Sequence, residues 1–165
     1  MKKILLGLFF FSSLSAFAQY DDDYKPFHFG VGGALSIPLG DLKSSTTYGV
    51  GFELMPSYAV SENLETFLQA GIHVFKGTAG YGYDAPSVLH IPLLVGARLK
   101  ASGFFAGAGV GYGLYSLDGE SSKGFTYSPQ VGYDFGSYEI GANYTSTKVT
   151  GGSLSYVGLK AFRKF

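Results

Sequence analysis

The sequence predicts an all-β protein, an eight-stranded antiparallel up-and-down transmembrane β-barrel. The first observation is a period of two: between residues 89 and 114, apolar side chains alternate with small or polar ones, as in strands with two unlike faces. The second is that one face is uniformly apolar, whereas the other is rich in glycine and carries a few cations. The third is an even number of such segments, joined by alternately short and long connections. Together they indicate lipid outside and a narrow polar lumen inside.

The first half of the chain supplies four strands, at residues 27–38, 48–60, 64–74 and 89–100. The first alternates large apolar residues with glycine and serine, and the second turns Glu53 away from its apolar face. In the third, polar residues lie on the face opposite to that of Leu68 and Ile72, and in the fourth they lie opposite the face of Leu93. Residues 61–63 form a tight turn, and residues 39–46 and 76–87 form the longer loops.

The second half supplies strands at residues 104–114, 125–135, 138–147 and 154–165. Residues 101–103 close the central hairpin, and Gly136-Ser137 is a two-residue turn. Residues 118–124 are expected to form a polar loop, and residues 150–153 the last loop. Short turns at one end and longer loops at the other are typical of outer-membrane barrels.

Outward aromatic residues provide an independent check, because barrels carry aromatic girdles at both membrane interfaces. One set falls near the ends that the short turns define: Phe27, Tyr58, Phe104, Phe135, Tyr138 and Phe165. The other falls toward the long loops: Tyr48, Tyr112, Tyr127 and Tyr144. A soluble lipocalin-like barrel is the structural alternative, but it would turn its larger apolar residues inward.

Composition limits the chain to one domain of 165 residues without cysteine, hence without disulfides or thiolate metal sites. The sequence has no run of basic residues of the kind that binds nucleic acid. Two lysines, an apolar run and Ala16-Phe17-Ala18 predict a cleaved signal peptide over residues 1–18, followed by a polar lead at 19–26 and the barrel domain at 27–165. Asp21, Asp22 and Asp23 belong to that lead and are interpreted as solvated.

The chain resembles the OmpA/OmpX-like outer-membrane β-barrel family, in the Bacteroidetes form often labelled porin family. The residues that carry the resemblance are IPLGD at 37–41, HIPLL at 90–94, FFAGAG at 104–109 and the terminal strand YVGLKAFRKF. The resemblance implies the bacterial outer membrane as location, with outer-membrane lipids and lipopolysaccharide around the barrel. It also implies that barrel-assembly machinery reads the terminal strand. We expect a monomer. Arg163 and Lys164 depart from the family's aromatic ending.

The interior is the candidate site. The polar side chains expected to line the lumen are Glu53, Gln69, His73, His90, Arg98, Gln130, Asn143 and Lys160. An eight-stranded lumen is just wide enough for side chains to fill, so we favour a salt-bridged, plugged interior over a polar path or ligand site.

Specific interior contacts are also expected. Asp134 should face Glu139 across the Gly136-Ser137 turn, with a cation such as Lys100 nearby. The inward histidines, His28 among them, fall at heights that do not converge, which favours isolated residues over metal ligands.

No catalytic, cofactor or metal residues are predicted. Outer-membrane lipid A deacylases carry a His-x-Ser pair, and none of the three histidines here begins one. The residues before the first strand are too few and too acidic for the amphipathic helix of palmitoyl-transfer barrels. The expected function is therefore non-enzymatic, either envelope structure or surface interaction through loops such as 77–84. The alternative is a small passive porin-like channel or a carrier of hydrophobic ligands.

Overall fold

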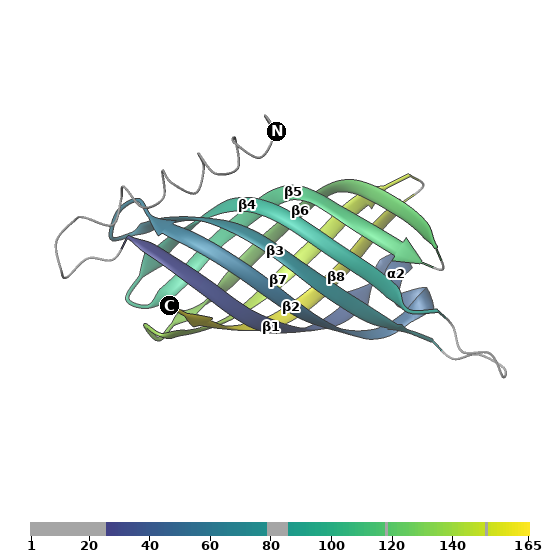
Figure 1. Cartoon of the computed structure of the whole chain (residues 1–165), viewed down its shortest axis with the longest axis horizontal. Helices are drawn as coiled ribbons and strands as arrows, with labels where there is room; N and C mark the ends of the chain where they lie inside the picture. The colour runs from purple at the N-terminus through teal and green to yellow at the C-terminus, as the bar shows by residue number, and fades with distance from the viewer. Residues whose placement is uncertain (1–25, 79–85, 118, 151) are drawn as a thin grey trace, which may run out of the picture.

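The strands close into a barrel in which every neighbour is antiparallel. The computed structural model describes residues 26–78, 86–117, 119–150 and 152–165. In them the order is β1 (Phe27–Leu39), α2 (Gly40–Ser45), β2 (Thr46–Ala59), β3 (Leu64–Gly77), β4 (Val88–Ala101), β5 (Phe104–Leu117), β6 (Glu120–Asp134), β7 (Tyr138–Val149) and β8 (Gly152–Lys164). Each strand pairs with the next, and β1 pairs with β8, so the predicted up-and-down barrel is confirmed (Figure 1).

Some predicted segments fall outside the described residues. They are the signal peptide at 1–18, nearly all of the lead at 19–26, and most of the loop at 77–84. Within the described part of the chain, no helix is long and apolar enough to cross a membrane.

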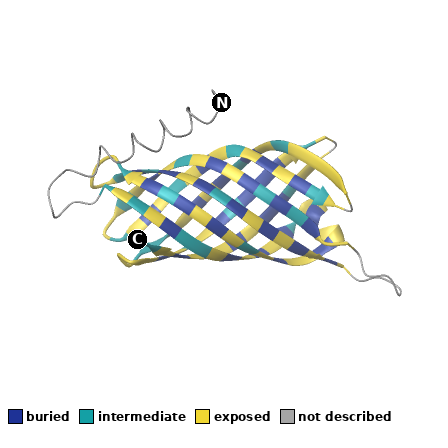
Figure 2. Cartoon of the chain, viewed as in Figure 1, coloured by how far each residue is buried: buried dark blue, intermediate teal, exposed yellow. Residues whose placement is uncertain are grey.

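The two faces of the wall have opposite character. Figure 2 shows exposed and buried residues alternating along the strands, as the period of two predicts. On β4, for example, Leu93 is 62% exposed and its neighbour Leu94 only 2%. Large apolar residues thus point outward on every strand, whereas inward positions hold charged side chains such as Glu53, Arg98 and Lys160. A water-soluble barrel would have the reverse arrangement, so the exterior is one that lipid would cover.

The β2–β3, β4–β5 and β6–β7 connections lie at the end of the barrel where β1 begins and β8 ends, which we call the short-turn end; α2 lies at the other, the long-loop end (Figure 1). The predicted alternation of short and long connections holds only in part, because at the long-loop end β5 ends at Leu117 and β6 begins at Glu120, and β7 ends at Val149 and β8 begins at Gly152.

The β4–β5 turn is a two-residue hairpin, because Ala101 pairs with Phe104. Both central residues have positive φ, 49° at Ser102 and 85° at Gly103. A two-residue hairpin with this backbone matches the twist of its strands and favours glycine.

This turn allows a prediction. Replacing Gly103 by alanine should destabilise the barrel by about 1–2 kcal/mol, because a residue with a Cβ is strained in the left-handed backbone conformation that Gly103 adopts. That Cβ would also lie 2.6 Å from Cζ of Tyr133. Urea unfolding of the refolded protein in lipid vesicles measures the change. Ser102→Asn, which creates the preferred Asn-Gly pair, should be neutral or stabilising; a loss equal to that of Gly103→Ala would contradict the argument.

Three predicted loops are structured differently. Residues 150–153 were expected to be the last loop, but β8 begins at Gly152, which pairs with Val149 of β7. Residues 39–46 were expected to be a loop, but Gly40–Ser45 form one short helix, fixed by a 2.6 Å hydrogen bond from the Thr46 hydroxyl to the Leu42 carbonyl. Residues 118–124 were also expected to be a loop, yet β6 begins at Glu120, opposite Leu117 of β5. The prediction failed there because a strand that extends beyond lipid needs no apolar face, so its sequence looks like a loop.

Candidate functional site in the barrel interior

The inward side chains form three groups along the barrel axis. From the short-turn end they are a network of ion pairs around Arg98, a second group around Glu53, and a cluster of aromatic and apolar residues under α2. All eight side chains that the sequence placed in the lumen lie inside the wall, each 7% exposed or less. Whether they line a path for any solute is a separate question, which the contacts below address.

Arg98 of β4 holds the first group together. Its Nε donates to Glu65 on β3 at 2.8 Å, and an Nη donates to Glu139 on β7 at 2.6 Å. Because β5 and β6 separate β4 from β7, the second bond crosses the lumen. The guanidinium carbon also lies 4.6 Å from the ring centre of Phe105, a cation–π distance. One side chain therefore ties three strands together.

Lys100 and Lys164 extend this network to the mouth of the barrel. Lys100 pairs with Glu65, and its Nζ lies 2.9 Å from Oδ2 of Asp134. Asp134 stands opposite Glu139 in the β6–β7 ladder, so the prediction of facing carboxylates with Lys100 nearby is confirmed. Lys164 also pairs with Asp134. The sequence does not directly predict this contact. The signal that could have indicated it is the alternation along β8, because Lys164 falls on the same inward face as Lys160 and Phe162.

Glu53 of β2 is the centre of the second group. It accepts a hydrogen bond from the Gln69 amide of β3 at 3.0 Å, and Lys160 of β8 lies 3.1 Å from the same carboxylate oxygen, Oε2. Its other oxygen lies 2.9 Å from Nε2 of His73. The carboxylate thus has a cation, an amide and an imidazole as neighbours. The cation and the amide, both on Oε2, offset part of the hydration that this buried charge loses.

The histidines are arranged differently from the prediction. His73 of β3 and His90 of β4 are direct neighbours in the ladder, with ring centres 6.0 Å apart, so the expectation that their heights do not converge is wrong. The pairing offset between β3 and β4 decides this, and the sequence does not fix that offset. His28 lies apart from them, near the short-turn end opposite Ser57. Among the described residues, no group of ligating side chains is arranged to hold a metal ion.

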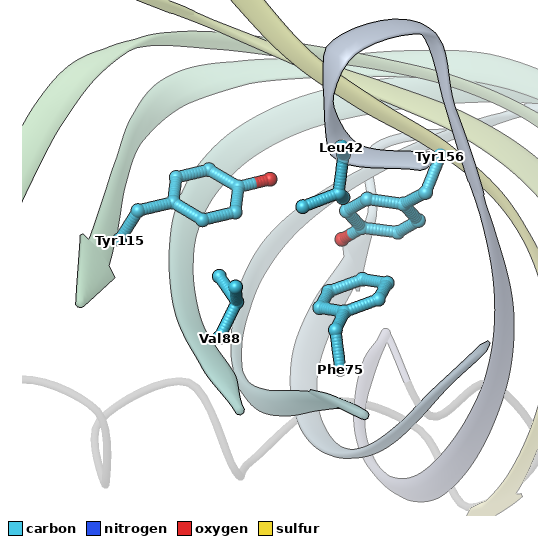
Figure 3. Packing of buried hydrophobic residues seen from close by; sticks show 5 residues of the cluster. All are labelled: Leu42, Phe75, Val88, Tyr115 and Tyr156. Atoms are coloured by element: carbon cyan, nitrogen blue, oxygen red, sulfur yellow. The ribbon is translucent and has the colours of Figure 1, made fainter. Parts of the chain in front are cut away.

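Tyr156 of β8 reaches across the barrel to these histidines. Its hydroxyl lies 3.4 Å from Nδ1 of His90, on the opposite strand β4, and its ring centre is 5.6 Å from that of His73. Tyr156 also belongs to the cluster drawn in Figure 3, in which side chains from the helix and four strands point toward one another. Its members are Leu42, Phe75, Val88, Tyr115 and Tyr156, all at most 4% exposed. Leu42 enters from α2, so the helix packs against this cluster at the long-loop end.

Charge is balanced inside the described barrel. The inward carboxylates are Glu53, Glu65, Asp134 and Glu139, and the inward cations that pair with them are Arg98, Lys100, Lys160 and Lys164. Each charge has at least one partner of opposite sign. The four negative and four positive charges therefore cancel.

The remaining predicted lumen residues are neutral. Gln130 of β6 stands opposite Asn143 of β7, and the Asn143 amide donates to the Thr145 hydroxyl at 2.7 Å. Ser128 and Thr145 are joined at 2.8 Å. The β6–β7 side of the lumen is therefore lined at this level by neutral polar side chains.

Comparison with known proteins was made on both sequence and structure. No protein-family model matches the chain, and no curated protein matches it. Solved structures do match. The crystal structure of Ail, the attachment invasion locus protein of Yersinia pestis, is 15% identical, covers 86% of this chain and 100% of its own, and has a TM-score of 0.55. The chain has the fold of small outer-membrane β-barrels.

Two further matches agree. Ail of Yersinia pestis in a phospholipid bilayer nanodisc is 14% identical over 84% of this chain and 98% of its own, with a TM-score of 0.58. A de novo designed transmembrane β-barrel is 14% identical over 86% and 98%, with a TM-score of 0.53. At these identities the likeness concerns the fold alone.

As in other outer-membrane barrels, aromatic residues lie on the outer face near both ends. Of the aromatic residues that the sequence predicted for the girdles, Phe27, Tyr58, Phe104, Phe135, Tyr138 and Phe165 are exposed at the short-turn end, and Tyr48 and Tyr112 at the long-loop end. Tyr127 and Tyr144 are half-buried, because their rings pack at a centre distance of 6.0 Å. Contact of these residues with the membrane interface stays a prediction.

Aromatic side chains surround Arg163, the outward charge on β8. Arg163 donates to the Tyr138 hydroxyl at 2.6 Å, and its guanidinium lies 5.3 Å from the ring centres of both Tyr138 and Phe165. The cation is thus held among aromatic faces at the end of the outer-membrane barrel, where a charge is tolerated best.

Proposed function

We propose that this protein is a non-enzymatic, non-conducting outer-membrane barrel that serves envelope structure or surface interaction. The observation that carries the proposal is the bond between Arg98 and Glu139, which crosses the lumen within a network of paired charges. A channel needs a continuous file of water, and this network occupies the place where that file would run. The OmpA/OmpX-like, Bacteroidetes-type family is the one that we propose for the chain, on the motifs quoted above.

The other two groups support the same function. Lys160 and Glu53 bridge β8 and β2 in the middle of the barrel, and Tyr156 meets His90 near the long-loop end. A solute would have to separate contacts at three successive levels. Each separation would leave a buried charge or polar group without a partner, at a cost of several kcal/mol for a charge. These contacts favour a structural role over a passive pore.

The buried hydroxyls support a non-enzymatic role. A serine or threonine nucleophile needs a base within hydrogen-bond reach. In the described chain, two pairs of inward hydroxyls are bonded to each other instead, Thr126 with Thr147 at 2.7 Å and Ser128 with Thr145 at 2.8 Å.

The partners that follow are also proposals. Outer-membrane lipids and lipopolysaccharide would cover the apolar exterior, and barrel-assembly machinery would read β8. That strand ends beside β1, where Phe165 and Phe29 exchange two backbone hydrogen bonds of 3.0 and 3.1 Å. We propose a monomer, with function at the membrane surface in the loops of the long-loop end.

Single-channel recording tests the proposal. The refolded protein, inserted into a planar bilayer and confirmed as folded by its resistance to denaturant, should give no conductance steps. A large open porin, added to the same bilayer, provides the positive control. Discrete steps whose size or ion selectivity changes in Lys160→Gln or Arg98→Gln would show a path through the lumen, and would overturn the structural role in favour of a small pore.

A further inference from the structure

Two histidines face each other inside the lumen, on strands that are neighbours in the wall. His73 of β3 stands opposite His90 of β4 in the ladder, their ring centres are 6.0 Å apart, and both residues are 0% exposed. Glycines leave the space that the two rings fill. A Cβ on Gly51 would collide with the ring of His73, and one on Gly113 would lie 2.6 Å from the other ring. The rings therefore have little room to move apart while their strands stay paired.

His73 has charged groups close to it. Its Nε2 lies 2.9 Å from Oε1 of Glu53 on β2, and Lys160 of β8 lies 3.1 Å from the other oxygen of that carboxylate. The ring of Tyr156, also on β8, is centred 5.6 Å from the ring of His73. A proton on His73 would thus form an ion pair with a carboxylate that already has one cation.

His90 has contacts with neutral groups. From β8 the Tyr156 hydroxyl lies 3.4 Å from its Nδ1, and from β5 the ring of Tyr115 stacks on it at a centre distance of 4.0 Å. At this level β6 and β7 contribute hydroxyls, those of Thr126 and Thr147. Within the described ranges His90 forms no ion pair, and its buried Nε2 has no hydrogen-bond partner. A proton on this ring would add a buried charge without a carboxylate beside it.

The ladder between β3 and β4 is interrupted directly beside this pair. Gly71 and Ile72, the two residues before His73, have no ladder partner on β4. By the register, Pro92 stands opposite Gly71, and proline has no N–H to donate to the neighbouring strand. On its other side β4 pairs with β5 through the same residues without a gap. The wall therefore has fewer backbone hydrogen bonds between β3 and β4 just where the histidines meet.

The other edge of β3 is interrupted at nearly the same level. Leu68 and Gln69 have no ladder partner on β2, where Pro56 stands opposite Leu68 by the register. Over residues 68–72, β3 is thus joined less firmly on both of its sides. A segment with few backbone hydrogen bonds can open locally while the rest of a fold stays closed.

We propose that β3 and β4 separate locally at this seam in acid, when His73 and His90 are both protonated, and close again at neutral pH. At an effective dielectric constant of about 20, two positive charges 6.0 Å apart disfavour the closed seam about 100-fold. Separation admits water to both rings and relieves this repulsion. The open seam therefore binds protons more readily than the closed one, so falling pH favours the open form. This response goes beyond the proposed function, which concerns the closed barrel.

Hydrogen exchange tests the seam. The refolded protein in lipid nanodiscs is followed by NMR at about pH 7.5 and about pH 5, and the rates are corrected for the intrinsic pH dependence of exchange. Protection of the amides in residues 71–75 and 88–91 should fall about 30-fold at the lower pH, the factor by which a histidine that titrates at about 6.5 in water favours its protonated form there. Protection of the amides of β5 should change less than about three-fold, because the ladder of β5 with β4 is continuous.

Replacements at His90 show whether its charge is the cause. His90→Gln removes the charge, and His90→Phe removes it but keeps the stacking on Tyr115, so that at least one variant retains the packing of the folded barrel. Either should reduce the fall in protection to less than about three-fold. The matched control is His28→Gln, which removes the histidine near the short-turn end and should keep the full response.

A separate variant tests the interrupted ladder. Pro92→Ala returns an N–H to β4 opposite Gly71, and should reduce the opening about five-fold at both pH values. A fall in protection that is the same in the His90 variants as in the unchanged protein, or one that is equally large in β5, would overturn the proposal.

The two proposals fail in different ways. A barrel that is electrically silent at neutral pH and shows no acid-dependent exchange at the seam would overturn the seam and leave the structural function intact. Conductance steps at neutral pH, together with an acid-dependent fall in protection that His90→Gln abolishes, would overturn the structural function and leave the seam intact.

Discussion

Replacing Arg98 by methionine is expected to destabilise the barrel by about 3–5 kcal/mol, because it leaves a buried charge without its partner. Glu139 would lose its salt bridge entirely, whereas Glu65 would keep Lys100. The free energy of unfolding in urea, followed in lipid vesicles by far-UV circular dichroism and by gel mobility, measures the loss.

Two further variants show whether the lost charge pair is the cause. Arg98→Met combined with Glu139→Gln removes both members of the cross-lumen pair, and should recover most of the loss. Arg163→Met removes an arginine from the outer face near the same end, and should change stability by less than about 1 kcal/mol. If the double variant is no more stable than Arg98→Met, the packing of the side chain rather than its charge would explain the effect.

The second large effect is expected for Tyr156→Ala, which should destabilise the barrel by about 3–5 kcal/mol. The tyrosine is 1% exposed and packs against His73, His90 and Phe75, so its removal leaves a cavity between opposite strands. The same urea titration measures the change.

The controls separate the ring from its hydroxyl. Tyr156→Phe keeps the ring and loses only the contact with His90, so it should destabilise by about 1 kcal/mol or less. Tyr138→Ala removes an exposed tyrosine of the outer face and should have a much smaller effect than Tyr156→Ala. Equal losses for the phenylalanine and alanine variants at Tyr156 would mean that the polar contact, and not the packing, holds the two sides of the barrel together.

The fold was predictable because the membrane imposes a simple rule on each strand. Lipid on one side and a narrow lumen on the other force a strict alternation, so the facing of residues such as Leu93 and Leu94 follows from sequence parity. The three short turns followed from glycine, serine and asparagine between apolar runs. The loop at 118–124 could not be recognised as the beginning of β6, since the rule ends where the lipid ends.

The interior was predictable in kind but only partly in detail. Contacts across a tight hairpin, as between Asp134 and Glu139, follow from counting residues away from the turn. Contacts between β3 and β4 depend on the pairing offset after a long loop, which explains why the meeting of His73 and His90 was missed. Contacts across the lumen, such as Arg98 with Glu139, depend on the stagger of all eight strands together.

The last strand contributes more than the closing ladder. It brings Lys160 to Glu53 and Lys164 to Asp134. Before β8 docks, the described inward carboxylates outnumber the inward cations that pair with them by two. A partly assembled barrel would therefore hold surplus negative charge, and it would have to keep water inside until that strand arrives. The interior therefore loses its water in the same late step of assembly in which β8 pairs with β1. A chain in which β8 has not docked keeps a hydrated interior and an unclosed barrel.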